Sequence, residues 1–348
     1  MVELCAAGRG KPDDVRAWLA SLAELIPVPD RFARYTMSRD ATLNFLKIGE
    51  HTLDTLAGDG LRFRDSDGDR FFEQHDVWTL GFHSGTNRSV SELASKSVVR
   101  FCRGAAGEWV RPMSWRVRTF AACPEREKCD GTWTHAPIRP DLVHGRVLET
   151  TVGPGARAPE PSGQVGGKPA TVVLDCVTES RGEKLPLRSP LARRLYRETL
   201  GELRSGEIRF QALPGALAAQ PDLARSHRIT NCMSTATYLA KTLTEGGLTA
   251  RSRNGYLAGV GAMPHGWTEI YEDGVWKILD PTVAFVARRW HLKDAQADQF
   301  DEFCAGSPYN RLIPFDCEAG AALVSHTHDA VAFPEVPTEV DARAASAR

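Results

Sequence analysis

A β-hairpin is predicted by the stretch His265–Thr282, which reads HGWTEIYEDGVWKILDPT. Polar and apolar residues alternate on both sides of Asp273–Gly274, a dipeptide that strongly favours a two-residue hairpin turn. Pairing outward from this turn sets position 272 opposite 275, 269 opposite 278 and 267 opposite 280, so His265 and Asp280 share one face of the sheet, one diagonal step apart. The stretch therefore predicts a hydrogen bond between His265 and Asp280. The alternative is a histidine that is merely satisfied at a sheet edge.

A helix that begins at a cysteine is predicted by a second stretch, HRITNCMSTATYLAKTLTEGG, which spans residues 227–247. Thr230 or Asn231 is a suitable N-cap, apolar residues follow at helical spacing, and Gly246–Gly247 ends the pattern. Cys232 then lies in the first turn, where unsatisfied N–H groups and the helix dipole stabilise a thiolate. A core cysteine is the alternative for this stretch taken alone.

The segment from about Leu187 to Phe285 resembles the transglutaminase-like superfamily. The resemblance is carried by Cys232, by the run GLTAR at 247–251, by HGWTEIY at 265–271 and by WKILDPT at 276–282. It implies an α+β fold with a papain-like core, in which the Cys helix packs on an antiparallel sheet, preceded by an N-terminal mixed α/β extension. It also implies a catalytic triad of Cys232, His265 and Asp280. The chain departs from the family pattern at Asn231, where Gly is common, and at Gly266, where Ala is usual.

The resemblance implies thiol-dependent acyl transfer. Thiolate Cys232 attacks a carbonyl carbon, His265 protonates the leaving group, and the Cys232 backbone N–H is an expected oxyanion donor. Trp267 is expected beside the triad, where it would contact substrate and limit water, with a core role as the alternative. We favour amide formation between an acyl donor (a peptide, an amide or a thioester, free or carrier-bound) and an amine acceptor. The alternatives are a cysteine peptidase or amidase, and a non-catalytic binding module.

The composition and net charge indicate which classes of binding partner to expect. Hydrophobic residues make up 42% of the 348 residues, charged residues 25%, and the net charge is −1, values typical of a folded globular protein. There is no apolar run long enough to span a membrane, and the first 22 residues lack the order of a signal peptide. We therefore expect a cytoplasmic protein that binds neither nucleic acid nor membrane.

Four regions are predicted along the chain. Residues 1–150 are expected to form a region of their own that serves as a lid or docking domain. Residues 151–169 are rich in Gly and Pro and predict a linker or long loop. Residues 170–330 would hold the catalytic domain, and the polar stretch 331–348 predicts a disordered tail.

No metal and no cofactor are expected from the motifs. The stretch Asp65–Asp76 fails the calcium-loop pattern and favours a hairpin turn, and Gly166–Pro169 fails the phosphate-loop pattern. Cys123 and Cys129 lack zinc-ligand spacing and favour unrelated thiols. His326-Thr-His328-Asp329 favours a solvated loop.

Overall fold

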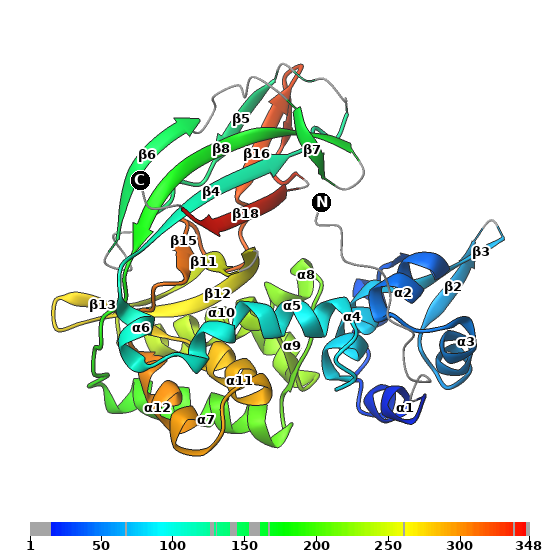
Figure 1. Cartoon of the computed structure of the whole chain (residues 1–348), viewed down its shortest axis with the longest axis horizontal. Helices are drawn as coiled ribbons and strands as arrows, with labels where there is room; N and C mark the ends of the chain where they lie inside the picture. The colour runs from blue at the N-terminus through cyan, green and yellow to red at the C-terminus, as the bar shows by residue number, and fades with distance from the viewer. Residues whose placement is uncertain are drawn as a thin grey trace. The chain divides into compact units, whose positions relative to one another are not determined.

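The computed structural model describes residues 15–66, 68–125, 129, 131–139, 145–152, 161–165, 168–259, 262–336 and 338–345. The fold mixes helices with several small sheets, nearly all of them antiparallel (Figure 1). Residue contacts divide the chain into two compact units, one of Met1–Ser95 with Gln211–Ala216 and the other of Lys96–Phe210 with Leu217–Arg348.

The first unit contains helices around a three-stranded sheet of order β1-β3-β2. Its elements are α1 Val15–Ala23, a 3₁₀ helix Asp30–Phe32, β1 Tyr35–Ser38, α2 Arg39–Leu46, α3 Glu50–Gly58, β2 Phe63–Ser66, β3 Asp69–Glu73, α4 Gln74–His83 and α5 Val90–Val98, within which the division falls. Strands β2 and β3 pair from Phe63↔Phe72 to Ser66↔Asp69. The predicted hairpin over this stretch is therefore confirmed.

The remaining elements follow in chain order. They are a 3₁₀ helix Arg100–Arg103, α6 Ala106–Val110, β4 Met113–Ala121, β5 Thr132–His135, β6 Arg146–Val152, β7 Pro161–Val165, β8 Lys168–Ser180, α7 Pro190–Ser205, β9 Arg209–Phe210, α8 Gly215–Ala218, α9 Pro221–Ser226, β10 Ile229–Thr230, α10 Cys232–Glu245, β11 Ala250–Ala258, β12 Ala262–Glu272, β13 Val275–Leu279, α11 Pro281–Trp290, α12 Asp294–Phe303, β14 Ala305–Gly306, β15 Leu312–Pro314, β16 Val324–His328, β17 Val331–Phe333 and β18 Thr338–Ala344.

A five-stranded antiparallel sheet of order β14-β13-β12-β11-β15 carries helix α10 on one face (Figure 1). The hydroxyl of Thr268 on β12 donates to the carbonyl oxygen of Ala236 on α10 at 3.0 Å, which ties helix to sheet. The expected arrangement of a Cys helix packed on an antiparallel sheet is therefore present.

The β12–β13 hairpin has the predicted register. Its pairs run from Glu272↔Val275 through Glu269↔Ile278 to Thr268↔Leu279. At the turn, Asp273 and Gly274 have φ values of 56° and 80°. Two successive positive φ angles are those of a type I′ turn, whose twist matches that of the strands it joins.

Two other sheets are present, one of order β18-β4-β8-β6 with β7 paired to β8, and one of order β17-β16-β5. Here the structure differs from the predicted regions. Strand β8 pairs antiparallel with β4, which joins residues on both sides of the boundary expected at 150. In place of a disordered tail, β18 pairs with β4 from Thr338↔Ala121 to Ala344↔Trp115, because its alternating Val340 and Ala342 are buried in the core below.

Two further predictions concern segments near these sheets. Of the predicted linker 151–169, residues 153–160 and 166–167 lie outside the described residues, and the rest belongs to strands β6, β7 and β8. His326 and His328, predicted in a solvated loop, lie on β16 and are buried.

Within the described ranges, no helix combines the length and apolar character needed to cross a bilayer.

Candidate active site

Cys232 is the first residue of α10 and is partly exposed. The side chain of Asn231 caps the helix by accepting the backbone N–H of Ser234 at 2.8 Å. The N–H groups of the first turn have no partner within the helix, and they carry the positive end of its dipole. This position therefore stabilises negative charge on the Cys232 sulfur and on an oxygen bound beside it.

His265 lies on β12, with 4% of its surface exposed. Its Nε2 is 2.7 Å from Oδ2 of Asp280, so the predicted hydrogen bond is present. An ionised carboxylate can only accept, which places the proton of this bond on Nε2. Cys232 also contributes to the raised pKa of His265, and Nδ1 is the ring nitrogen that Asp280 leaves available to the thiol. The imidazole thus lies between the thiol and the carboxylate.

Asp280 follows β13 directly and is the N-cap of α11. Its Oδ1 accepts the Thr282 hydroxyl at 2.9 Å and the Val283 N–H at 3.0 Å. Its Oδ2 accepts the Tyr309 hydroxyl at 2.6 Å in addition to His265. Four donors around a carboxylate that is 1% exposed hold it in one orientation and keep it ionised.

The opposite charges of His265 and Asp280 stabilise each other. Burial lowers the pKa of His265, but the charge of Asp280, its hydrogen bond and smaller contributions from Cys232 outweigh burial and raise the pKa to about 10. Burial likewise raises the pKa of Asp280, whereas attraction to His265 and the hydrogen bonds from His265 and Tyr309 lower it overall. The site therefore favours an imidazolium paired with a carboxylate.

Sequence reasoning did not find Tyr309, whose hydroxyl is one of these four donors. The ring of Phe101 stacks on that of Tyr309 with centroids 5.4 Å apart and planes at 22°. The neighbouring Asn310 donates through Nδ2 to the carbonyl oxygens of Glu108 and Arg111, at 2.8 and 2.7 Å. The segment 101–111 thus holds Tyr309 in contact with Asp280. No local spacing in the sequence encodes this contact.

Trp267 is a core residue, which was the alternative to its predicted contact with substrate. It is 1% exposed, and its ring stacks beside His265 with centroids 5.9 Å apart. Its Nε1 donates to Glu269, a fully buried carboxylate that also pairs with Arg251 and Arg253. Because so little of its surface is accessible, Trp267 fixes the His265 ring and offers little surface for substrate contact.

Helix α10 and strand β12 approach each other closely at Gly266. A Cβ at this position would lie 2.7 Å from Sδ and 3.0 Å from Cα of Met233, the residue after Cys232. The departure from the usual Ala is therefore required by the close approach that brings Cys232 to His265.

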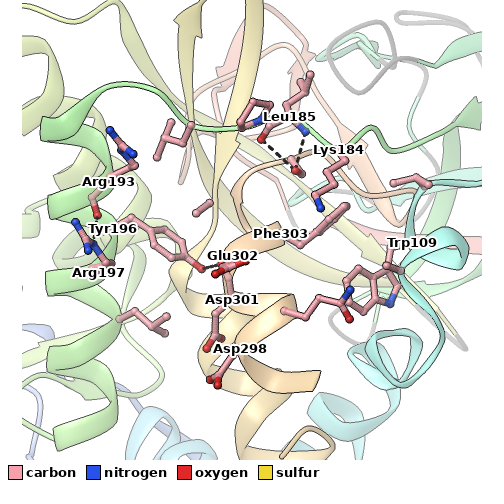
Figure 2. A pocket seen from close by; sticks show the side chains of 18 of the residues that line it. Trp109, Lys184, Leu185, Arg193, Tyr196, Arg197, Asp298, Asp301, Glu302 and Phe303 are labelled. Atoms are coloured by element: carbon pink, nitrogen blue, oxygen red, sulfur yellow. Dashed lines mark hydrogen bonds between the residues drawn. The ribbon is translucent and has the colours of Figure 1, made fainter. Parts of the chain in front are cut away.

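A cavity of about 1030 Å³ lies elsewhere in the same unit, among residues of α6, α7, α12 and the segment 184–187 (Figure 2). The Tyr196 ring extends from α7 so that its hydroxyl donates to the carbonyl oxygen of Asp301 at 2.7 Å (Figure 2). Cys232, His265 and Asp280 are not among the residues that line this cavity. This cavity is therefore separate from the three residues of the candidate active site.

Comparisons with known proteins do not assign this chain to a family. No family model matches the chain. A search of curated proteins also finds no match. Among solved structures, the chain is similar to one described as "a Putative Cysteine Protease from Cytophaga hutchinsonii", with 14% sequence identity and a TM-score of 0.34, over 68% of this chain and 92% of the other.

Proposed function

We propose that this protein is a thiol enzyme that transfers an acyl group through a thioester on Cys232, with an amine as the acceptor. One observation carries the proposal. His265 is hydrogen-bonded at Nε2 to Asp280, at 2.7 Å, and Cys232 is close enough to contribute to the raised pKa of its imidazole. A partly exposed thiol at a helix start, with an imidazole oriented by a buried carboxylate, is the arrangement that nucleophilic thiol catalysis requires.

The reaction runs in two halves. In the resting pair the thiol proton is held on Nδ1 of His265, and the Cys232 thiolate attacks the carbonyl carbon of the donor. The same Nδ1–H then protonates the leaving group, which departs and leaves a thioester. In the second half an amine attacks the thioester carbon, His265 takes the amine proton, and the Cys232 thiolate leaves as the amide forms. The Cys232 backbone N–H donates to the oxyanion in both halves.

An amine acceptor is supported by the shielding of the catalytic groups on one side. His265 and Asp280 are buried, and Trp267 covers the ring of His265 within the core. The acceptor consequently enters from the side where Cys232 is exposed, and an amine bound there excludes water from the thioester. The motif order also resembles a superfamily that includes amide-forming members. Hydrolysis, which would make the protein a peptidase or amidase, is the other outcome of the test.

Intact-mass spectrometry of the acyl-enzyme tests this function. The full chain is incubated with thioester or peptide donors, and the mass increase is mapped to a peptide. We expect an adduct on Cys232 that added amine discharges as amide faster than water does. Cys232→Ala should reduce turnover by about 10⁴-fold or more, because no other nucleophile is proposed. Cys317→Ala, which removes another partly buried thiol, is the matched control.

Two results separate the alternatives. If discharge is as fast without amine as with it, transfer to an amine is refuted and hydrolysis stands. If no donor yields an adduct on Cys232 while the Cys317→Ala control behaves like wild type, the thiol-enzyme proposal itself fails and a non-catalytic binding role is favoured.

A further inference from the structure

Four side chains that the sequence separates come together away from the triad. They are Cys123, Cys129, His326 and His328, and one ligand atom from each lies within 4.8 Å of all the others. Cys123 follows strand β4, and both histidines lie on β16. The predictions of unrelated thiols and a solvated histidine loop are therefore wrong, because pairing of β5 with β16 brings the two segments together.

The histidines occupy alternate positions of one strand, so both point to the same side of the sheet. His326 is 2% and His328 4% exposed. Nε2 of His326 lies 3.1 Å and Nδ1 of His328 2.8 Å from Sγ of Cys129. Two imidazole nitrogens thus converge on one sulfur, while Cys123 is 3% exposed and completes the group.

The outer nitrogens of both rings lie beside oxygen atoms that favour a proton on them. Nδ1 of His326 is 3.0 Å from the carbonyl oxygen of Thr132, which can only accept, so that nitrogen carries a proton. Nε2 of His328 makes no hydrogen bond, but it is 3.3 Å from a carboxylate oxygen of Asp329, whose charge favours a proton there as well. In the neutral rings, the inner nitrogens then present lone pairs to the Cys129 sulfur. A thiol has one proton to share between them, whereas a metal cation satisfies both lone pairs and the sulfur at once.

The surroundings hold the group in place. The backbone N–H of Gly131 donates to Sγ of Cys129 at 3.3 Å. A Cβ on Gly131 would lie 2.6 Å from Cε1 of His326, so only glycine allows this approach. The ring of Trp133 stacks on His326 at 3.9 Å between centroids. Hydrogen bonds from the protein to the ligands, and a dry apolar wall around them, are characteristic of protein metal sites.

We propose that Cys123, Cys129, His326 and His328 bind one Zn²⁺ ion in a tetrahedral structural site. Two thiolates and two imidazoles are a preferred zinc donor set, and tetrahedral Zn–S and Zn–N bonds place the ligand atoms roughly 3.4–3.8 Å apart. The recorded spacings need to change by only about 1 Å or less to reach that range. Binding releases the proton of each thiol that is protonated. Four protein ligands leave no position for substrate, so the ion joins the segment after β4 to β16 and takes no part in the acyl chemistry.

Metal content and coordination test the site directly. The full chain is purified, incubated with Zn²⁺, freed of excess metal and measured by elemental mass spectrometry. We expect about one zinc per chain. X-ray absorption at the zinc edge should show two sulfur ligands at about 2.3 Å and two nitrogen ligands at about 2.0–2.1 Å.

Variants locate the ion. Cys129→Ser and His328→Gln should each lose most of the bound zinc and lower the melting temperature, whereas Cys317→Ser, a thiol outside the group, should retain one equivalent. Less than about a tenth of an equivalent in the wild-type protein overturns the proposal, as does zinc that persists in both variants. If the variants do not fold, the wild-type absorption spectrum decides, because a shell of oxygen and nitrogen without two sulfurs also overturns it.

Discussion

Replacing Asp280 with Asn tests the electrostatic basis of the site. The carboxylate supplies the largest of the contributions that raise the pKa of His265. A rise from 6.5 to about 10 corresponds to about 5 kcal/mol in favour of the imidazolium, at about 1.4 kcal/mol per pKa unit. Asp280→Asn removes the charge and leaves the shape nearly unchanged. Burial then dominates, and the pKa of His265 should fall below 6.5.

The amide also reverses the hydrogen bond. Its oxygen can still accept from Thr282 and the Val283 N–H, which leaves the NH₂ group facing Nε2 of His265. Nε2 must then accept, the ring proton moves to Nδ1, and the imidazole can no longer take the proton of Cys232. In the Ser-His-Asp template the same substitution costs about 10⁴-fold in turnover, and we expect a similar loss here.

Two assays follow the change. Nuclear magnetic resonance of ¹⁵N-histidine-labelled protein reports the titration of His265, identified by the resonance missing in His265→Gln. The rate of iodoacetamide alkylation at Cys232, followed by mass, reports the reactivity of the thiol and should fall about tenfold or more near neutral pH. Asp316→Asn, a carboxylate that pairs with Arg253 and does not contact His265, is the matched control.

The raised pKa also fixes a pH dependence of stability. His265 stabilises the folded state fully below the unfolded value of 6.5, and this contribution is lost as the pH rises through about 10. The difference in denaturation midpoint between wild type and Asp280→Asn should therefore shrink from pH 6.5 to 10. The reasoning is refuted if His265 in the variant still carries its charge at pH 8, or if alkylation stays within about threefold of wild type.

Two further substitutions test the supports of the site. Gly266→Ala places a methyl group against Met233 and should destabilise the protein by about 1–3 kcal/mol while slowing alkylation of the active thiol, as thermal denaturation and mass spectrometry would measure. Gly201→Ala, in α7 with nothing near its Cβ position, is the control and should not destabilise; equal behaviour of the two would contradict the close approach. Tyr309→Phe removes a donor to the Asp280 carboxylate and should cost about 1.5–3 kcal/mol in the free energy of unfolding from urea titrations. An unchanged midpoint in that variant would mean that this hydrogen bond contributes nothing to stability.

Local patterns in the sequence determined the parts of the site that lie on single elements. The N-cap and glycine stop defined α10 and placed Cys232 at its start, as the structure has it. The Asp273–Gly274 turn set the register of β12 and β13, and with it the hydrogen bond between His265 and Asp280. These features depend on helix period, strand alternation and turn geometry, which act over a few residues and are visible in the order of side chains.

Tertiary structure alone decided the contacts between distant segments. Tyr309 reaches Asp280 only because the loop after β14 packs against residues 101–111. Cys129 meets His326, 197 residues further along, only because β5 pairs with β16. Strand β18 orders the predicted tail by pairing with β4. No spacing in the sequence encodes such pairings, because which edges and faces meet is set by burial of apolar surface summed over the whole unit.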